Sequence, residues 1–208
     1  MKEFCHNIKP FPQPIPYINP AGDCFACALT ATLQFLFPEN PPEFLKVWSY
    51  FLGDDGDLSN SWIGMRMALY RASNDYDIEI AVDIVKPEYD IERSSHPWWY
   101  FKPGLKYIQR LEGWLRAGWV AFSEIDDVGR GCYLQNGDLN STNHFIVIDG
   151  IRSYLIDVIE NGKLLGSREE YAIHIVNSSR NREHSYWIGL GDFIHKHGGA
   201  GWWLCRRS

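Results

Sequence analysis

Cys24 stands where reactive thiols are often found, at the start of a predicted helix. The apolar run 24–37 is long and rich in Ala and Leu, which predicts a buried helix rather than a strand. The pair Gly22-Asp23 precedes it and suits a turn with an N-terminal cap. The partial positive charge of a helix N-terminus stabilises a thiolate, and the free amides there can bind an oxyanion. Cys24 is therefore a candidate nucleophile; the ordinary alternative is a small buried residue that begins a helix.

His144 is the histidine best placed to act as the base of such a thiol. It opens the apolar segment 144–150, which follows the polar loop 139–143. This pattern predicts a histidine at the lip of a sheet, on a strand that is buried. In a Cys–His pair the imidazole takes the thiol proton during attack on a carbonyl. The alternative is an ordinary histidine at a strand edge. His174 lies in the middle of a predicted strand and suits the role less well.

A third group usually orients the imidazole of a Cys–His pair, and two residues after His144 could do so. Asn177 directly follows a predicted strand, and it would return beside His144 if residues 151–170 form an inserted hairpin. Asp157 would do so if the chain turns back at Gly150. Both alternatives remain open at this stage, with Asn177 preferred.

The cysteines predict neither a disulfide framework nor a metal site. Five is an odd number, and the chain is too long to need disulfides for its stability. Cys24 and Cys27 form a C-x-x-C, but a zinc site would need a second pair at similar spacing. A redox pair of the thioredoxin type should follow a strand, whereas here a proline-rich arm precedes it. We interpret Cys27 as a core residue of the helix and expect no cofactor and no metal.

The remaining elements predict an α+β fold. Helices are expected mostly in the first part of the chain and strands mostly in the second, and this segregation argues against a wound parallel sheet. We expect a single domain over 1–208, with a mainly helical lobe over 1–77 and a mainly β lobe over 78–208. Further helices are predicted over 43–52, 61–72, 104–117 and, as a short helix, 189–199. Strands are predicted over 78–85, 118–125, 143–150, 170–176 and 200–207, with a hairpin turn at Asn161-Gly162 within 153–165.

Composition narrows the class of protein. The chain has 208 residues, of which 45% are hydrophobic and 22% charged, as in a globular protein with a real core. Its net charge of −6 argues against nucleic acid as a partner, since nucleic-acid binders usually carry a basic face. Residues 1–14 contain no apolar run long enough for a signal peptide, and no stretch of the sequence has the length of an apolar membrane-spanning helix. We therefore expect a cytoplasmic protein that acts without a membrane; its oligomeric state cannot be read from the sequence.

Three segments together resemble the papain-like cysteine peptidases, in particular the C39-like and streptopain-like peptidases. Residues 22–28 resemble the signature in which a turn of small residues, the nucleophilic cysteine and an aromatic residue open the central helix. Residues 144–150 are similar to the strand that begins with the catalytic histidine, and 171–178 resemble the strand whose asparagine orients it. The resemblance implies a papain-like fold with a central helix that starts at Cys24 and a C-terminal antiparallel sheet.

The resemblance also implies a residue that completes the oxyanion hole. The family usually has a glutamine six residues before the cysteine, and this chain has Ile18 there. Asn19, one residue later, has the required donor chemistry, and Gln13 is the alternative if the proline-rich arm folds back. The implied activity is hydrolysis of peptide or isopeptide bonds in a peptide or protein substrate. The alternatives are an acyltransferase of transglutaminase-like type and an inactive papain-like module that binds peptides or proteins, using aromatic residues such as Trp98-Trp99.

Overall fold

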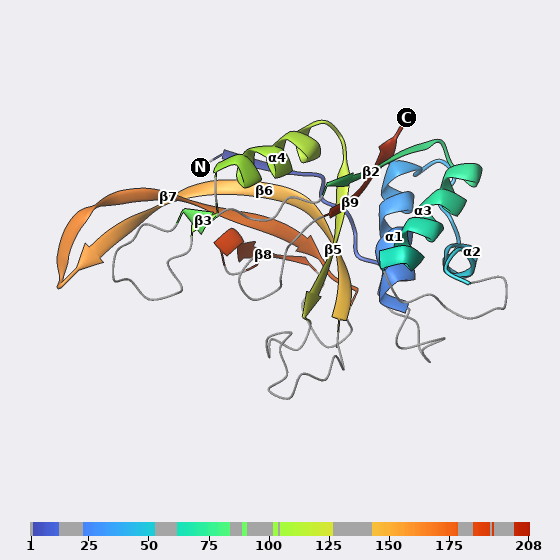
Figure 1. Cartoon of the computed structure of the whole chain (residues 1–208), viewed down its shortest axis with the longest axis horizontal. Coiled ribbons are helices and arrows are strands. Elements are labelled where there is room, and N and C mark those ends of the chain that lie inside the picture. Colours follow the sequence, from blue (N-terminus) through green and yellow to red (C-terminus); the bar gives the residue numbers. More distant parts are fainter. Residues whose placement is uncertain are drawn as a thin grey trace.

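Helices cover both faces of one antiparallel sheet in the computed structural model of the chain (Figure 1). Helices α1, α2 and α3 gather at one end of the sheet, and α4 lies over the sheet nearer its middle. The mixture of helices and antiparallel strands agrees with the predicted α+β class. The structure describes residues 2–12, 23–52, 62–83, 89–90, 102–103, 105–126, 143–178, 185–191, 193 and 202–208.

Strand β6 is the centre of the main sheet. The strand order is β2-β9-β5-β6-β7-β8. β5 pairs with residues 143–148 of β6, and β1 pairs with residues 150–153 along the same edge of that strand. All the pairings among the described strands are antiparallel, and β3 pairs with β4 in a separate small sheet. The strands are β1 (Lys2–Cys5), β2 (Ile78–Asp83), β3 (Tyr89–Asp90), β4 (Lys102–Pro103), β5 (Val120–Asp126), β6 (Asn143–Glu160), β7 (Lys163–Val176), β8 (Ser185–Gly189) and β9 (Trp202–Arg207).

The sheet separates two hydrophobic cores, and β6 contributes to both. Phe145 and Val147 pack in the core beneath α1, whereas Ile146 and Ile148 pack in the core beneath α4. Successive side chains of a strand point to opposite faces, so an unbroken apolar run is what a strand covered on both faces requires. The four residues are at most 1% exposed. The apolar segment that predicted a buried strand is thus the centre of the molecule.

Helix α1 is buried around most of its circumference, because the sheet lies on one side of it and α2 on another. Twelve of its 14 residues are buried, and most of these are Ala, Leu or Cys. Pro38 follows the end of the helix and cannot continue it. The helices among the described residues are α1 (Asp23–Leu36), α2 (Phe44–Ser49), α3 (Trp62–Asp75) and α4 (Leu105–Arg116). The helices predicted over 24–37, 43–52, 61–72 and 104–117 are thus confirmed with bounds that differ by a few residues, whereas most of 189–199 lies outside the described residues.

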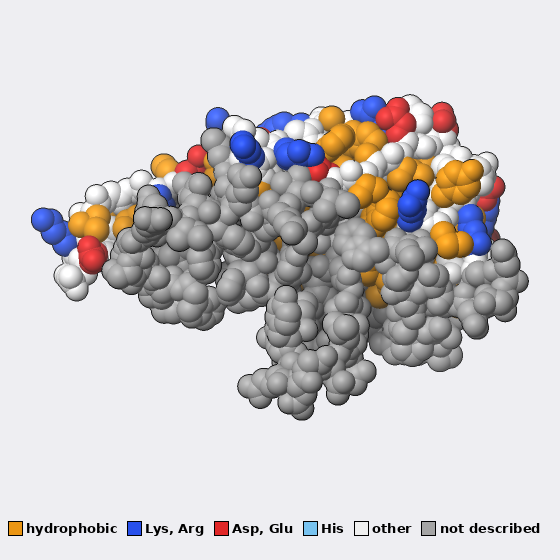
Figure 2. All heavy atoms as spheres, in the orientation of Figure 1, with side chains coloured by type: hydrophobic (Ala, Val, Ile, Leu, Met, Phe, Trp, Pro, Cys, Tyr) orange, Lys and Arg blue, Asp and Glu red, His pale blue; other side chains and the backbone are white. Residues whose placement is uncertain are grey.

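Strands β6 and β7 form a long hairpin whose outer half extends beyond the sheet (Figure 1). Asn161 and Gly162 occupy the turn with φ of 50° and 76°, the left-handed pair that a tight hairpin prefers. The predicted hairpin is therefore confirmed, and a turn back at Gly150 is wrong, because β6 continues through it. Apolar side chains lie at the surface near the tip, at the left of Figure 2: Leu155, Ile159, Leu164 and Leu165.

The sequence did not predict β1 or β8. Residues 2–5 precede the proline-rich arm and contain only four residues, too few for a reliable periodic pattern. β1 is nevertheless held in the sheet, because residues 2–5 pair in register with residues 150–153 of β6. The backbone N–H of His6 continues this pairing by donating to the carbonyl of Asp149, 2.9 Å away. The N-terminal strand is thus fixed by β6 rather than by its own propensity.

Gly150 allows β1, β6 and β7 to approach closely. It pairs with Cys5 on one side and with His174 on the other. A Cβ atom at position 150 would lie 2.9 Å from both Cys5 Sγ and His174 Cβ. The strands would have to separate, so we expect Gly150→Ala to lower the free energy of unfolding by about 1–3 kcal/mol. Denaturant titration followed by circular dichroism measures this.

Gly113 provides the matched control for this substitution. It lies on the exposed side of α4, and a Cβ atom there meets nothing within 4 Å. Gly113→Ala should raise the free energy of unfolding by about 0.5–1 kcal/mol, because alanine favours the helix more than glycine does. Equal stabilities of Gly150→Ala and the wild type would contradict the close packing of the three strands.

Candidate functional site

Cys24 is the second residue of α1 and is almost completely buried, with 3% of its surface exposed. Burial disfavours the thiolate and raises the pKa of the thiol to about 11. Hydrogen bonds from the backbone of Phe145, Phe25 and Cys24 itself oppose this shift, and the negative charge of Asp23 adds to it. The thiol is therefore protonated at neutral pH, and its use as a nucleophile requires a base.

His144 lies on β6, directly before a residue that contacts the start of α1. The hydrogen bond between Cys24 and the backbone of Phe145 brings the sulfur to this point of β6. The rings of Phe25 and Phe145 stack with their centroids 3.7 Å apart and hold the helix against the strand. The backbone of His144 pairs with Ile125 of β5. The start of α1 and the backbone of His144 are thus close, while the side chain of His144 lies outside the described part of the structure.

Asn177 follows β7 near the same end of the hairpin. It is fully buried and comes one residue after Val176, which pairs with Val147 of β6. Val147 is three residues along β6 from His144, so Asn177 follows β7 near the end of the strand that carries the histidine. The inserted hairpin that this arrangement requires is present. The structure therefore places the start of α1 beside the strand that begins with Asn143 and His144, and Asn177 follows the neighbouring strand at that end of the hairpin.

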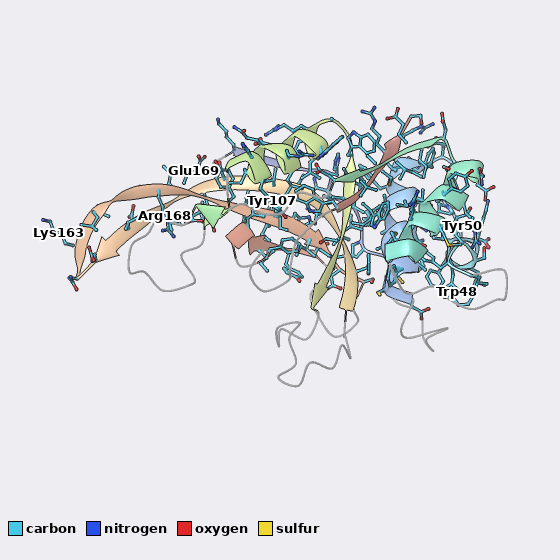
Figure 3. All side chains as sticks on the ribbon, viewed as in Figure 1. Trp48, Tyr50, Tyr107, Lys163, Arg168 and Glu169 are labelled. Atoms are coloured by element: carbon cyan, nitrogen blue, oxygen red, sulfur yellow. The ribbon has the colours of Figure 1, made fainter. Side chains whose placement is uncertain are left out.

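Asp157, the alternative third residue, lies far from this place. It is exposed on the outer half of the hairpin, pairs with Ser167 and accepts a 2.9 Å hydrogen bond from its hydroxyl. It lies thirteen positions after His144 on one continuous strand, which corresponds to about 40 Å. In Figure 3, Lys163 and Arg168 mark this part of the hairpin, at the opposite end of the molecule from Trp48.

The oxyanion candidates Asn19 and Gln13, and also Trp98-Trp99, lie outside the described residues.

Asp23 places a buried carboxylate next to Cys24. It is the first residue of α1 and is fully buried. Its Oδ1 accepts a 3.2 Å hydrogen bond from the indole Nε1 of Trp48 on α2. A carboxylate at a helix N-terminus is stabilised by the helix dipole. Asp23 therefore joins α2 to the start of α1 and fixes the position of the helix end that carries the thiol.

Cys27 is a core residue, as predicted, with none of its surface exposed. None of the described cysteines, Cys5, Cys24, Cys27 and Cys205, takes part in a disulfide. The C-x-x-C pair lies within α1, on residues that are both buried. A redox-active pair must be exposed so that it can exchange disulfides, and both thiols of this pair are buried.

A second group of reactive side chains lies across β1, β6 and β7. Asp149 Oδ1 is 2.5 Å from His174 Nδ1, and Cys5 Sγ lies 3.4 Å from the same nitrogen. The carboxylate is fully buried, and its other oxygen accepts a 2.8 Å hydrogen bond from the backbone N–H of Ile8. Thiol, imidazole and carboxylate are all metal ligands, so this cluster could hold an ion.

The electrostatics of the cluster favour a charged histidine. Burial lowers the pKa of His174, but the hydrogen bonds with Asp149 and Cys5 outweigh it and raise the pKa to about 10. In the absence of a metal, His174 and Asp149 therefore form a buried ion pair. Such a pair is favourable only when its partners are held in good geometry, which the pairing of three adjacent strands provides here.

Sequence reasoning missed this cluster because its members share no spacing motif. Cys5 and Asp149 are separated by 144 positions, and Asp149 and His174 by 25. Asp149 lies at a β-bulge, where the pairing of β6 with β7 shifts between Ile148 and Gly150. The sequence holds one signal of the cluster: Asp149 is a charged residue inside the apolar segment 144–150. A charged residue is rarely buried unless it has a partner.

Comparison with known proteins identifies a similar fold. No family model and no curated protein matches the chain. The solved structures include a protein from Bacillus anthracis assigned as a C39-like peptidase, with a TM-score of 0.53 and 11% sequence identity over 99% of this chain and 97% of that one. At this identity the likeness shows the fold alone. The chain therefore has an α+β fold that resembles that of a C39-like peptidase.

The helices in the described ranges are all shorter than a membrane span. None of those in the described ranges has both the length and the apolar character needed to cross a bilayer. The longest, α1 and α3, have 14 residues each, whereas a span needs about 20.

The ion pair predicts a stability that depends on pH. The folded pKa of His174, about 10, is above its ordinary value of 6.5. Its stabilising contribution is therefore complete below about pH 6.5 and is lost as the pH rises towards about 10. In metal-free buffer, we expect the free energy of unfolding to fall over this range more steeply for the wild type than for His174→Gln. A difference between the two proteins that stays constant with pH would contradict the ion pair.

Proposed function

We propose that this protein is a cysteine-peptidase-like hydrolase that cleaves amide bonds, with Cys24 as nucleophile and His144 as base. The observation that carries the proposal is the contact between the two segments. The Cys24 thiol at the start of α1 forms a hydrogen bond with the backbone of Phe145, the residue after His144. The likeness of the fold to a C39-like peptidase supports the same reaction class. The proposed substrate is a peptide or protein, and the proposed setting is the cytoplasm, where thiols remain reduced.

The raised pKa of Cys24 determines how the reaction would begin. Because the thiol is protonated at neutral pH, His144 would remove its proton as the sulfur attacks, rather than rest beside it as an imidazolium with a thiolate. The sulfur forms a bond to the amide carbonyl carbon, and the carbonyl oxygen becomes an oxyanion. The backbone N–H of Cys24 and the side chain of Asn19 are the proposed donors to this oxyanion.

The second half of the reaction would regenerate the thiol. The imidazolium of His144 donates its proton to the leaving amine as the carbon–nitrogen bond breaks, which leaves a thioester on Cys24. Water, deprotonated by His144, then attacks the thioester, and the sulfur leaves with that proton. Asn177 would act as a positioning residue, because an amide that bonds to the second ring nitrogen holds the imidazole in the correct tautomer.

A binding function is the second candidate. Two observations favour it: the Cys24 thiol is buried with a raised pKa, and Ile18 stands where related peptidases have the oxyanion glutamine. A module of this kind would hold a peptide or protein without cleaving it. An acyltransferase would share the thioester and differ only in the acceptor, with an amine in place of water.

Substitution of the proposed catalytic pair tests the activity. A peptide library made from digested cell protein is incubated with the purified chain, and new peptide ends are counted by mass spectrometry. We expect Cys24→Ser and His144→Ala each to lower the cleavage rate by about 1,000-fold or more, because either change removes the thiolate attack. Cys27→Ser is the matched control, since it alters a buried thiol one helical turn away.

The outcomes separate the alternatives. Undiminished cleavage by Cys24→Ser would rule out the nucleophile. Equal losses in Cys24→Ser and Cys27→Ser would show that the loss follows from disturbed packing of α1 and not from the nucleophile. Absence of cleavage by the wild type, together with unchanged capture of peptides by Cys24→Ser, would favour the binding module. Peptides that gain an added amine, such as glycine ethyl ester, would favour an acyltransferase.

The third member of the site is tested separately. We expect Asn177→Ala to lower kcat by at least about 10-fold and to shift the pH dependence of kcat, because the base loses its orientation. Asp157→Ala should change neither, since Asp157 lies on the outer half of the hairpin. Asn177→Asp, which preserves the size of the side chain, shows whether the effect follows from misfolding. Loss of activity in Asp157→Ala alone would reverse the assignment.

A further inference from the structure

Cys5, Asp149 and His174 form a cluster that has no part in the proposed peptidase reaction. Cys5 and His174 flank Gly150 on the neighbouring strands, and Asp149 precedes Gly150 at the bulge of β6. Gly150 is five residues along β6 from Phe145, which corresponds to about 17 Å between this cluster and the segment that contacts Cys24. The two groups of reactive side chains are thus at separate places on one strand.

The cluster does not have the geometry of a catalytic triad. In a triad the nucleophile and the carboxylate contact opposite nitrogens of the imidazole: one nitrogen takes the proton of the nucleophile, and the carboxylate orients the ring through the other. Here Cys5 Sγ and Asp149 Oδ1 both approach Nδ1 of His174, at 3.4 Å and 2.5 Å. The three donor atoms therefore converge on one point instead of lying on opposite sides of the ring.

Convergence of these three donors is what a metal ion requires. Zinc bonds of about 2.0–2.3 Å place the ligand atoms of a tetrahedral site about 3.2–3.6 Å apart. The separations of Cys5 Sγ from His174 Nδ1 and from Asp149 Oδ1 are 3.4 Å and 3.8 Å, close to these values. Only the 2.5 Å contact between His174 and Asp149 is short, and it would lengthen by less than about 1 Å as a metal replaces the shared proton.

We propose that Cys5 Sγ, Asp149 Oδ1 and His174 Nδ1 bind a divalent transition metal, for which zinc is the best match. One sulfur, one nitrogen and one oxygen donor suit a borderline-soft ion better than magnesium or calcium, which prefer oxygen alone. A thiolate and a carboxylate together balance the charge of the ion, so the metal can be buried without excess charge. Three protein ligands leave the fourth tetrahedral position to a water molecule.

The surroundings of the cluster hold the ligands in place. The backbone N–H of Ile8 donates to Asp149 Oδ2 at 2.8 Å, which leaves Oδ1 directed at the other two donors. The ring of His174 packs against Trp187 of β8, with centroids 5.1 Å apart. Outer contacts of this kind orient metal ligands and raise the affinity of a site. His174 keeps 12% of its side chain exposed, so an ion could enter from solvent.

Cobalt and zinc binding to the full chain tests the proposal. Co²⁺ serves as the probe because Zn²⁺ has no absorption of its own, and a thiolate bound to Co²⁺ gives a charge-transfer band in the near ultraviolet. We expect the wild type to show this band at one equivalent, to lose it when Zn²⁺ is added, and to bind Zn²⁺ in calorimetry. Cys5→Ser should lack the band and bind Zn²⁺ more than about 100-fold more weakly, since a lost ligand should cost more than a lost outer contact.

Two further variants make the result decisive. His174→Ala removes a second ligand and should weaken Zn²⁺ binding to a similar extent, while far-ultraviolet circular dichroism confirms that each variant folds. Cys24→Ser is the matched control, because it removes a different thiol and should keep both the band and the affinity. The proposal is overturned if Cys5→Ser and His174→Ala bind Zn²⁺ as tightly as the wild type, or if the wild type shows neither the band nor measurable binding. In the second case the cluster is a hydrogen-bonded clamp that fixes β1.

Discussion

Burial of β6 on both faces is the constraint on which the rest of the structure depends. Its apolar residues Phe145–Ile148 are covered by α1 on one side and by α4 on the other. β5 and β1 share one edge of the strand, and β7 occupies the other. A strand enclosed in this way has its register fixed, because a slip by one residue would exchange the two cores. Both groups of reactive side chains are positioned from this strand.

The stacked rings of Phe25 and Phe145 link packing to chemistry at one end of β6. They hold the start of α1 against the strand, so the Cys24 thiol lies beside the backbone that follows His144. The same close packing excludes water from the thiol and raises its pKa to about 11. Tight packing therefore both creates the proposed site and makes a base indispensable to it.

Further along β6, a bulge and a glycine produce a different arrangement. The bulge turns the carboxylate of Asp149 towards its neighbours, and Gly150 lets Cys5 and His174 approach from both sides. Bulges redirect single side chains in this way without breaking a sheet. One strand thus carries two groups of reactive side chains, the first created by a helix contact and the second by close pairing of three strands.

The sequence by itself determined the helices, most strands and the long hairpin, because periodicity and turn residues act locally. It predicted 24–37 as a buried helix, 143–150 as a buried strand and Asn161-Gly162 as the turn. It also selected Cys24, His144 and Asn177 by their places at the ends of these elements. Only the tertiary structure decided that β6 continues past Gly150, which carries Asp157 far from His144. The cluster of Cys5, Asp149 and His174 also arises from strand pairing alone, since contacts between residues 144 and 169 positions apart leave no local pattern to recognise.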